Sequence, residues 1–153
     1  MAQPRWRVLF LCTGNSCRSQ MAEGWTRHLH GGSIEALSAG IVRHGLNPLA
    51  VQVMAEAGVD ISSHRSKTLA EVSEAAFDLV VTVCSSADAA CPAFHRATRR
   101  IHQPFDDPPA LARDAATAED ALRPYRRVRD EIRQFVMTLP DLLETNAFGH
   151  ESR

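Results

Sequence analysis

The chain has 153 residues, of which 44% are hydrophobic and 23% are charged, a composition typical of one folded globular domain. The formal net charge of −1 is too small to indicate nucleic acid as the partner. The longest apolar runs are far shorter than the roughly 20 residues of a membrane span. We therefore expect one cytoplasmic domain over 1–153, without a membrane span.

The first part of the chain alternates strand and helix patterns. Residues 8–12 are apolar without alternation, which predicts a strand buried on both faces. Apolar residues then recur every four positions over 21–29, which predicts a helix. A short second strand suits 34–39, and Asn47 followed by Pro48 predicts the start of a second helix.

The second part adds two strands and a long helix. Residues 77–84 are apolar and rich in β-branched side chains, which predicts a third strand. Residues 99–102 suit a fourth strand. Three prolines within 104–109 predict an extended loop with no helix. We expect a helix over about 118–140, ended or kinked by its final proline, and a frayed tail over 145–153.

This order of elements predicts a single three-layer α/β domain with a four-stranded, mostly parallel sheet flanked by helices. Ligands of such domains bind at the carboxyl ends of the strands. The two longest predicted strands end at Cys12 and Cys84, and the proline-rich loop carries Asp106 and Asp107. We expect these side chains at one edge of the sheet.

The segment after the first strand has the composition of an oxyanion-binding loop. Its residues are Thr13, Gly14, Asn15, Ser16, Cys17 and Arg18. Small residues allow successive amide groups to surround an anion, and the guanidinium of Arg18 can complete the ring. The same field should lower the pKa of Cys12 toward 7, and Ser19 can donate a hydrogen bond to its sulfur. A buried cysteine followed by a surface arginine is the alternative.

The four cysteines fall into two pairs, Cys12 with Cys17 and Cys84 with Cys91. Their spacings do not match those of a structural zinc site, so we expect no metal centre. In a chain large enough to fold without disulfides they indicate reactive thiols. Cys17 is expected to be structural. The alternative is that Cys84 is a buried core thiol and Cys91 an incidental surface thiol.

A resemblance to a known family begins at residues 12–25, which read CTGNSCRSQMAEGW. The stretch resembles the low-molecular-weight tyrosine phosphatases and, among them, the thioredoxin-coupled arsenate reductases. The other matching segments are SAG at 38–40, HGLNP at 44–48, DLVVTVC at 78–84, CP at 91–92, FDDP at 105–108 and RVRDEI at 127–132. The resemblance implies a nucleophile at Cys12, an oxyanion clamp at Arg18 and a general acid at Asp107, with Asp106 the weaker acid candidate.

The resemblance also implies a sequence of thiol exchanges. Cys12 attacks arsenate, Cys84 attacks Cys12 and expels arsenite, and Cys91 then carries the disulfide to the surface for reduction by thioredoxin. The small residues of 85–90 are compatible with a short helix that unwinds readily.

Two other functions use parts of the same pattern. A low-molecular-weight protein tyrosine phosphatase would apply Cys12, Arg18 and Asp107 to phosphate monoesters, but the single tyrosine, Tyr125, lies far from these residues in sequence and no aromatic wall is evident. A non-catalytic oxyanion-binding or arsenite-sensing module is the second alternative.

One residue departs from the family pattern. Many thioredoxin-coupled members bind potassium through residues that correspond to Asn15, Glu23, Ser38 and an aspartate, and this chain has Lys67 at the last position. A lysine cannot ligate a cation, but its ammonium could lie against Glu23; a solvated lysine is the other interpretation. We expect no obligatory cofactor and no stimulation by potassium.

Overall fold

The computed structural model describes residues 6–72, 76–90 and 98–151. Within these ranges one sheet is formed in the order β2-β1-β3-β4. The strands are β1 (Trp6–Cys12), β2 (Ile34–Gly40), β3 (Leu79–Thr82) and β4 (Arg99–His102). All three neighbouring pairs are parallel. The predicted four-stranded α/β fold is therefore confirmed, with a sheet that is wholly parallel.

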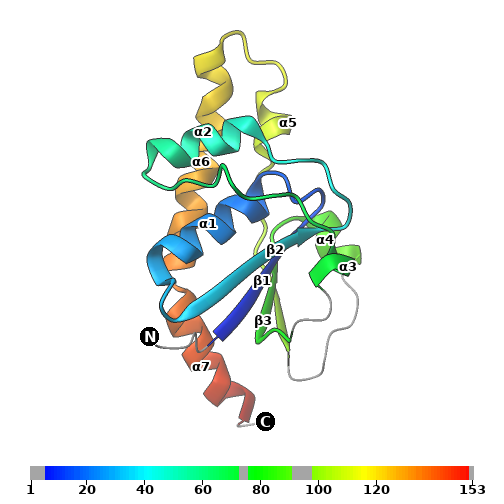
Figure 1. Ribbon diagram of the computed structural model, residues 1–153, viewed down its shortest axis with the longest axis vertical. Helices are drawn as coiled ribbons and strands as arrows, with labels where there is room; N and C mark the ends of the chain where they lie inside the picture. Colours follow the sequence, from blue (N-terminus) through cyan, green and yellow to red (C-terminus); the bar gives the residue numbers. More distant parts are fainter. Residues whose placement is uncertain (1–5, 73–75, 91–97, 152–153) are drawn as a thin grey trace.

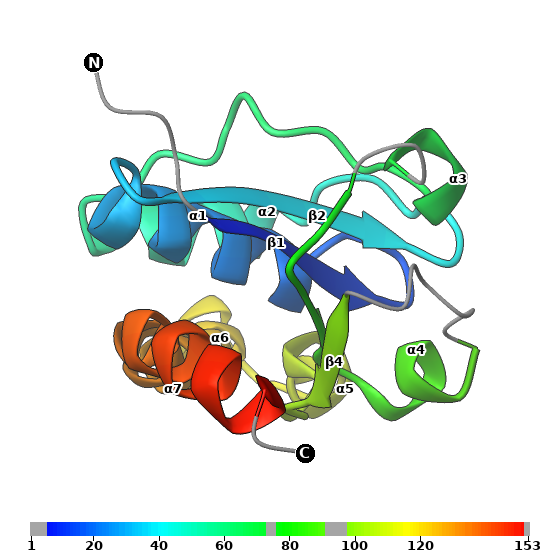
Figure 2. The same ribbon diagram turned by 90° about the horizontal axis from the view of Figure 1, so that it is seen from below.

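Helices cover both faces of this sheet, as Figures 1 and 2 show. The helices are α1 (Arg18–His30), α2 (Pro48–Glu56), α3 (Leu69–Val72), α4 (Ser85–Ala90), α5 (Pro108–Ala112), α6 (Ala118–Met137) and α7 (Leu139–Glu151). In Figure 2, α1, α6 and α7 lie on one side of the sheet, and α3 and α4 on the other. Both α2 and α5 pack against α6.

The hydrophobic core lies between the two central strands and α1. Residues 8–11 of β1 and 79–81 of β3 have no exposed surface, as expected of inner strands in a parallel sheet. Met21 and Trp25 of α1 are buried against them, and the indole nitrogen of Trp25 donates to the carbonyl of Arg129 in α6 at 3.1 Å. Each fully buried large side chain contributes roughly 1.5–3 kcal/mol. This packing fixes the position of the β1–α1 connection.

Two predicted boundaries can be compared with the structure. Asn47 caps α2 as predicted, because its side chain accepts hydrogen bonds from the amides of Leu49 and Ala50. The third strand is shorter than the predicted range 77–84, although the amide of Val83 still donates to the carbonyl of Leu11.

The expectation of no helix in the proline-rich loop is wrong. Helix α5 begins at Pro108, and Asp107 occupies its N-cap position. The first residues of a helix have no intrahelical partner for their amide groups, so Pro108 and Pro109 lose nothing there, and their fixed φ suits the helix. The prolines exclude a helix interior but permit a helix start.

The C-terminal region differs from its prediction in a similar way. Helix α6 ends at Met137, before the predicted end at Pro140, and Pro140 lies in the first turn of the following helix α7. Residues 145–151 belong to α7, whereas the sequence predicts a frayed tail there. In the part of the chain that the structure describes, no helix is both long and apolar enough to cross a membrane.

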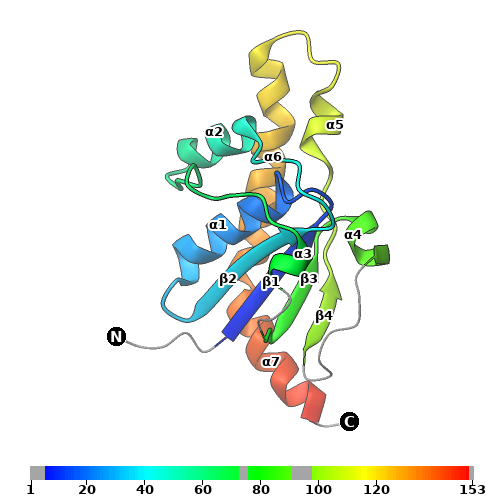
Figure 3. The ribbon, with the colours of Figure 1, turned by 45° about the vertical axis from the view of Figure 1, so that its right-hand side comes forward.

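The parallel strands bring their carboxyl ends to one edge of the sheet. Cys12 at the end of β1 pairs with Gly40, and Thr82 at the end of β3 pairs with His102. Figure 3 shows the arrowheads pointing toward the end where α4 and α5 lie. The sequence-predicted site residues follow these strand ends directly.

Candidate active site

The loop from β1 to α1 turns its carbonyl groups away from its centre. The carbonyl oxygens of residues 12–17 each accept a hydrogen bond. The donors, in order, are the amides of Ile41, Val42 and His44, the side chain of Gln20, and the amides of Asn47 and Met21. In a trans peptide the amide points opposite to the carbonyl, so the amides of 14–18 face inward. Among the described residues they donate to no acceptor, which leaves them free for an anion.

The buried side chain of Asn15 stabilises the backbone conformation of this loop. It adopts a φ of +49° in the left-handed region, which Asn tolerates better than most residues. Its fully buried side chain donates to the hydroxyls of Ser19 and Ser38, at 2.9 Å each, and its Oδ1 accepts from the amide of Lys67 at 2.7 Å and from Gln20 at 2.9 Å. Both sides of the amide are therefore satisfied.

Two glycines allow close approach to the loop. A Cβ on Gly40 would lie 2.7 Å from the backbone nitrogen of Asn15, so β2 can pass beneath the loop only with glycine there. A Cβ on Gly14 would lie 2.3 Å from Nδ1 of His44. The imidazole therefore packs directly on the loop.

Cys12 and Cys84 meet at the edge of the sheet. Both are buried, and each thiol is the neighbour that shifts the pKa of the other most strongly. The sulfur of Cys84 also contacts the hydroxyl of Thr13 at 3.1 Å and accepts from the amide of Ala87 at 3.4 Å. The two thiols that the sequence places 72 positions apart are neighbours because β1 and β3 are adjacent and parallel.

The two thiols shift each other's pKa in opposite directions. The hydrogen bond from Cys12, together with that of Thr13, lowers the pKa of Cys84 to about 5, although burial opposes the shift. The same bond, followed by burial, raises the pKa of Cys12 well above its ordinary value against the field of Arg18. The expectation that this field alone lowers the pKa of Cys12 is therefore wrong, because Cys84 competes for the charge.

Arg18 extends from the first turn of α1 across the mouth of the loop. Its Nη1 donates to the carbonyl of Phe105 at 3.0 Å, and its Nη2 lies 3.5 Å from Oδ1 of Asp107. Its Nε is buried and has no hydrogen-bond partner among the described residues. A buried guanidinium nitrogen without a partner is costly, and an oxyanion in the loop would satisfy it.

The two aspartates of the proline-rich loop face different surroundings. Asp107 makes no capping hydrogen bond with its side chain and lines the same cavity as Cys12. Asp106 points outward and forms an ion pair with Arg127 of α6 at 2.9 Å. Asp107 therefore faces the oxyanion-binding loop, whereas Asp106 connects the proline-rich loop to α6.

These groups surround a cavity of about 270 Å³. Its lining consists of Cys12, Thr13, Gly14, Ser16, Cys17, Arg18, His44, Asp107 and Pro109. Sequence reasoning did not single out His44 or Pro109. The signals for them were the matched segment HGLNP, which begins with His44, and the order of the strands, because the segments after β2 and β4 both reach the edge where β1 ends.

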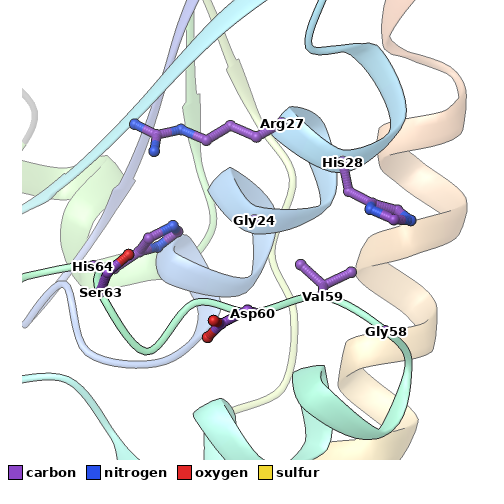
Figure 4. Close-up of a pocket in the computed structure, with 8 residues that line it drawn as sticks. All are labelled: Gly24, Arg27, His28, Gly58, Val59, Asp60, Ser63 and His64. Carbon is purple, nitrogen blue, oxygen red and sulfur yellow. The ribbon is translucent and has the colours of Figure 1, made fainter.

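Another cavity, of about 280 Å³, lies between α1 and the segment 58–64 (Figure 4). Arg27 and His28 point away from one another there, and Asp60 is occupied by hydrogen bonds from Ser62. This cavity contains no cysteine and no convergent set of groups, so we assign it no chemistry. Among the described residues no cluster of three potential metal ligands occurs.

Lys67 is a buried residue and not a solvated one. Its ammonium donates to the carbonyl of Arg65 at 3.0 Å and lies 3.8 Å from Oε1 of the buried Glu23. Glu23 also accepts from Ser38 at 2.5 Å and pairs with Arg27 at 2.7 Å. Of the two interpretations of Lys67, the structure supports an ammonium held beside Glu23.

Three further residues were predicted from the sequence to belong to the site: Ser19, Cys17 and Cys91. The hydroxyl of Ser19 accepts from Asn15, and no bond from Ser19 to Cys12 occurs among the described contacts. Burial raises the pKa of Cys17 to about 12, which keeps this thiol protonated. Cys91 lies outside the described residues.

Tyr125 is close to the site, which its position in the sequence did not suggest. It is buried in α6, and its hydroxyl accepts from the side chain of Asn47 at 3.0 Å. Its pKa is raised, chiefly by burial and also by the charges of Cys17 and Asp107. Its contact with the loop runs through Asn47, whose backbone amide donates to the carbonyl of Ser16. Tyr125 itself does not line the cavity.

Known proteins are similar to this chain in sequence. Residues 7–147 match the family model of the low molecular weight phosphotyrosine protein phosphatases. A curated arsenate reductase of Halalkalibacterium halodurans is 46% identical over 134 residues, which cover 88% of this chain and 94% of that protein.

Solved structures show the same likeness. A structure described as an arsenate reductase in the phosphate binding state superposes with a TM-score of 0.71 at 29% identity, over 90% of this chain and 98% of that one. A thioredoxin-dependent arsenate reductase of Corynebacterium glutamicum shares the fold at 24% identity, with a TM-score of 0.71 over 95% of this chain and 65% of that one. The chain belongs to the low molecular weight phosphotyrosine protein phosphatase family and, within it, to the arsenate reductases.

Proposed function

We propose that this protein reduces arsenate to arsenite by forming a disulfide between Cys12 and Cys84. The single observation that carries the mechanism is the position of the buried sulfur of Cys84, which lies 3.1 Å from the hydroxyl of Thr13, the residue next to Cys12 in the anion-binding loop. A phosphatase needs one thiol, whereas the reduction of arsenate needs two electrons, which two thiols supply when they become a disulfide.

The free amides of 14–18 and the guanidinium of Arg18 hold the tetrahedral oxyanion. The thiolate of Cys12 attacks arsenic while Asp107 donates a proton to the departing oxygen, which leaves as water. Cys84 accepts the proton that Cys12 must lose, because its sulfur lies beside Cys12 at the same loop. The product is an arsenic ester on Cys12.

The second step transfers the electrons. Cys84 first passes its proton to an oxygen of the bound arsenic, and the resulting thiolate attacks the sulfur of Cys12. The sulfur–arsenic bond breaks, and its electron pair remains on arsenic, which leaves as arsenite. Arsenic gains two electrons and the two sulfurs lose two. The hydroxyl of Thr13, the amide of Ala87 and the charge of Arg18 favour the thiolate of Cys84 in this step, because each of them lowers the pKa of that thiol and the thiolate is the nucleophile.

Regeneration requires a third thiol and an external dithiol. Cys91 attacks the sulfur of Cys84, which releases the thiolate of Cys12, and a thioredoxin in the cytoplasm reduces the resulting Cys84–Cys91 disulfide by exchange. The resemblance of residues 78–84 and 91–92 to the thioredoxin-coupled enzymes supports this step.

Hydrolysis of phosphate monoesters is the second candidate function. The same loop, Arg18 and Asp107 would act on phosphate, and the family match supports this candidate. The buried, acidic Cys84 favours reduction, because ester hydrolysis gives it no task.

The disulfides formed after one equivalent of arsenate test the proposal. The fully reduced protein is treated, quenched with an alkylating agent and digested, and the cross-linked peptides are identified by mass spectrometry. We expect Cys84–Cys91 in the unaltered protein and Cys12–Cys84 in the Cys91→Ser variant, with Cys17→Ser as the matched control that behaves like the unaltered protein.

Steady turnover provides a second measurement. With thioredoxin, its reductase and NADPH, arsenate should drive NADPH oxidation by the unaltered protein and by Cys17→Ser, but not by Cys84→Ser or Cys91→Ser. The Cys84→Ser variant should retain any hydrolysis of an aryl phosphate, since the chief cause that raises the pKa of Cys12 is then gone. Arsenate turnover by both Cys84→Ser and Cys91→Ser would overturn the proposed relay.

A further inference from the structure

A polar cluster outside the oxyanion cavity joins α4 to the edge of the sheet. The hydroxyl of Thr82, at the end of β3, donates to Oδ1 of Asp88 at 3.0 Å and lies 2.8 Å from Nδ1 of His102, at the end of β4. Nδ1 of His102 lies 3.8 Å from the same carboxylate oxygen. We name Thr82, Asp88 and His102 the α4 clamp.

The hydrogens of this cluster follow from the types of its groups. The single hydroxyl hydrogen of Thr82 has two acceptors within reach, Oδ1 of Asp88 at 3.0 Å and the carbonyl of Ile101 at 3.4 Å, and the nearer, charged oxygen is the stronger acceptor. The oxygen of Thr82 must then accept from His102, which carries a hydrogen on Nδ1. Thr82 has no exposed surface, whereas the side chains of Asp88 and His102 are 39% and 33% exposed. The buried hydroxyl therefore has a partner on each side.

The clamp holds a helix that has few other attachments. Helix α4 spans only six residues, too few to be stable without tertiary contacts. Of its described side chains Ala87 alone is buried, while Ser85, Ser86 and Ala89 are exposed. Among the described residues, Asp88 is the side chain of α4 that hydrogen-bonds to the sheet. The orientation of the helix therefore depends strongly on Asp88.

That orientation reaches the sulfur of Cys84. The amide of Asp88 donates to the carbonyl of Cys84 at 3.1 Å, which closes the first turn, and the amide of the adjacent Ala87 donates to the sulfur of Cys84 at 3.4 Å. If Asp88 loses its attachment to Thr82, the turn that aims the Ala87 amide loses its side-chain anchor. The thiol would then lose a donor that favours its thiolate.

We propose that Asp88 is a positioning residue for the second thiol. Anchored by Thr82 and His102, it holds the first turn of α4 so that Cys84 stays beside Cys12 with its sulfur activated. This role rests on the proposed exchange between Cys12 and Cys84, and it assigns a task to residues that do not touch the oxyanion. The loss of Asp88 slows the disulfide-forming step and leaves oxyanion binding intact.

The test compares Asp88→Ala with Asp88→Asn, which keeps an acceptor for Thr82, and with Asp114→Asn, a matched charge removal at an exposed position. After one equivalent of arsenate, the rate at which the Cys12–Cys84 disulfide forms is measured in a Cys91→Ser background. We expect a loss of about tenfold for Asp88→Ala, a loss of less than threefold for Asp88→Asn, and no change for Asp114→Asn.

Two readouts separate positioning from a general loss of structure. Calorimetric titration with inorganic phosphate should give the same affinity for every variant, because the oxyanion loop does not touch Asp88. The pH midpoint for alkylation of Cys84 by iodoacetamide, followed by peptide mass spectrometry, should shift upward by about one unit in Asp88→Ala. Should Asp88→Ala lose phosphate binding, Thr82→Val takes its place, since it removes the same anchor without changing side-chain volume.

The outcomes distinguish this inference from the proposed function. If the unaltered protein forms no Cys12–Cys84 disulfide with arsenate, the proposed function fails, but the alkylation midpoint still decides whether Asp88 positions Cys84. If Asp88→Ala and Thr82→Val both form the disulfide at the unaltered rate with an unchanged midpoint, Asp88 is not a positioning residue.

Discussion

The two cysteines that meet at the sheet edge belong to segments of very different construction. After β1, every carbonyl from 12 to 17 is hydrogen-bonded and Asn15 is fully buried. After β3, helix α4 has six residues and one buried side chain among those described. The oxyanion loop is thus held at many points, and the segment with the second thiol at few.

The difference matches the two tasks of the proposed reaction. A transition-state oxyanion is stabilised only by donors that stay in place, which a densely bonded loop provides. A thiol that must first react with Cys12 and then with Cys91 has to change its partner, which a weakly attached helix permits. The proposed reaction therefore requires a rigid oxyanion-binding loop after β1 and a mobile helix α4 after β3.

The largest effect on catalysis should come from a change in the oxyanion-binding loop, the more rigid of the two regions. Replacing Arg18 by Lys removes the planar fork that completes the ring of donors, so kcat/KM for arsenate should fall by roughly a hundredfold or more. Steady-state kinetics measure this, with Arg123→Lys at a highly exposed position as the control. A loss as small as that of the control would mean that the loop amides suffice without Arg18.

The stability of the loop should depend on Asn15 more than on any contact of α4. Asn15→Ala removes its side-chain hydrogen bonds and leaves an unfavourable φ of +49°, so the free energy of unfolding should fall by about 3 kcal/mol. Urea denaturation measures it. Asn15→Gly relieves the backbone strain and should recover part of the loss; equal losses in both variants would place the whole effect in the hydrogen bonds.

The thiols should differ in their pH dependence. Because the pKa of Cys84 is lowered to about 5 and that of Cys17 is raised to about 12, iodoacetamide should modify Cys84 at a rate that rises through pH 5, while Cys17 stays unmodified near neutrality. A lowered pKa stabilises the fold above the ordinary pKa of a thiol, and this contribution is lost as the pH falls through about 5. Preferential alkylation of Cys12 at pH 6 would contradict this order.

The smallest expected effect concerns potassium. Because the ammonium of Lys67 already lies 3.8 Å from Glu23, exchange of sodium for potassium at constant ionic strength should leave arsenate turnover unchanged. Coupled assays in matched chloride buffers measure this. A strong rise in potassium alone would show that a cation still binds beside the loop despite Lys67.

Much of the site can be predicted from local sequence. The apolar run before Cys12, the small residues up to Ser16 and the arginine at position 18 form a pattern whose physical meaning depends little on the rest of the chain. The separate environments of Asp106 and Asp107 also follow from local chain direction near Pro108.

Other features depend on contacts between distant segments. The low pKa of Cys84 arises from Cys12 and Thr13, and the proximity of Tyr125 to the site arises from packing of α6 against α1 and α2. No local pattern contains these contacts. Helix α5 differs from the expectation of no helix at Pro108 and Pro109, because proline interrupts a helix interior but is tolerated at a helix start, and only the fold decides which applies.

The sequence by itself determined the parallel α/β fold, the oxyanion loop and the presence of a second thiol at a strand end, because hydrophobic periodicity and short-range backbone geometry are local properties. Only the tertiary structure decided which sulfur carries the charge, where Lys67 lies and what anchors α4. A pKa and an anchor are set by whatever groups folding brings within a few ångströms, and these groups come from other strands and helices.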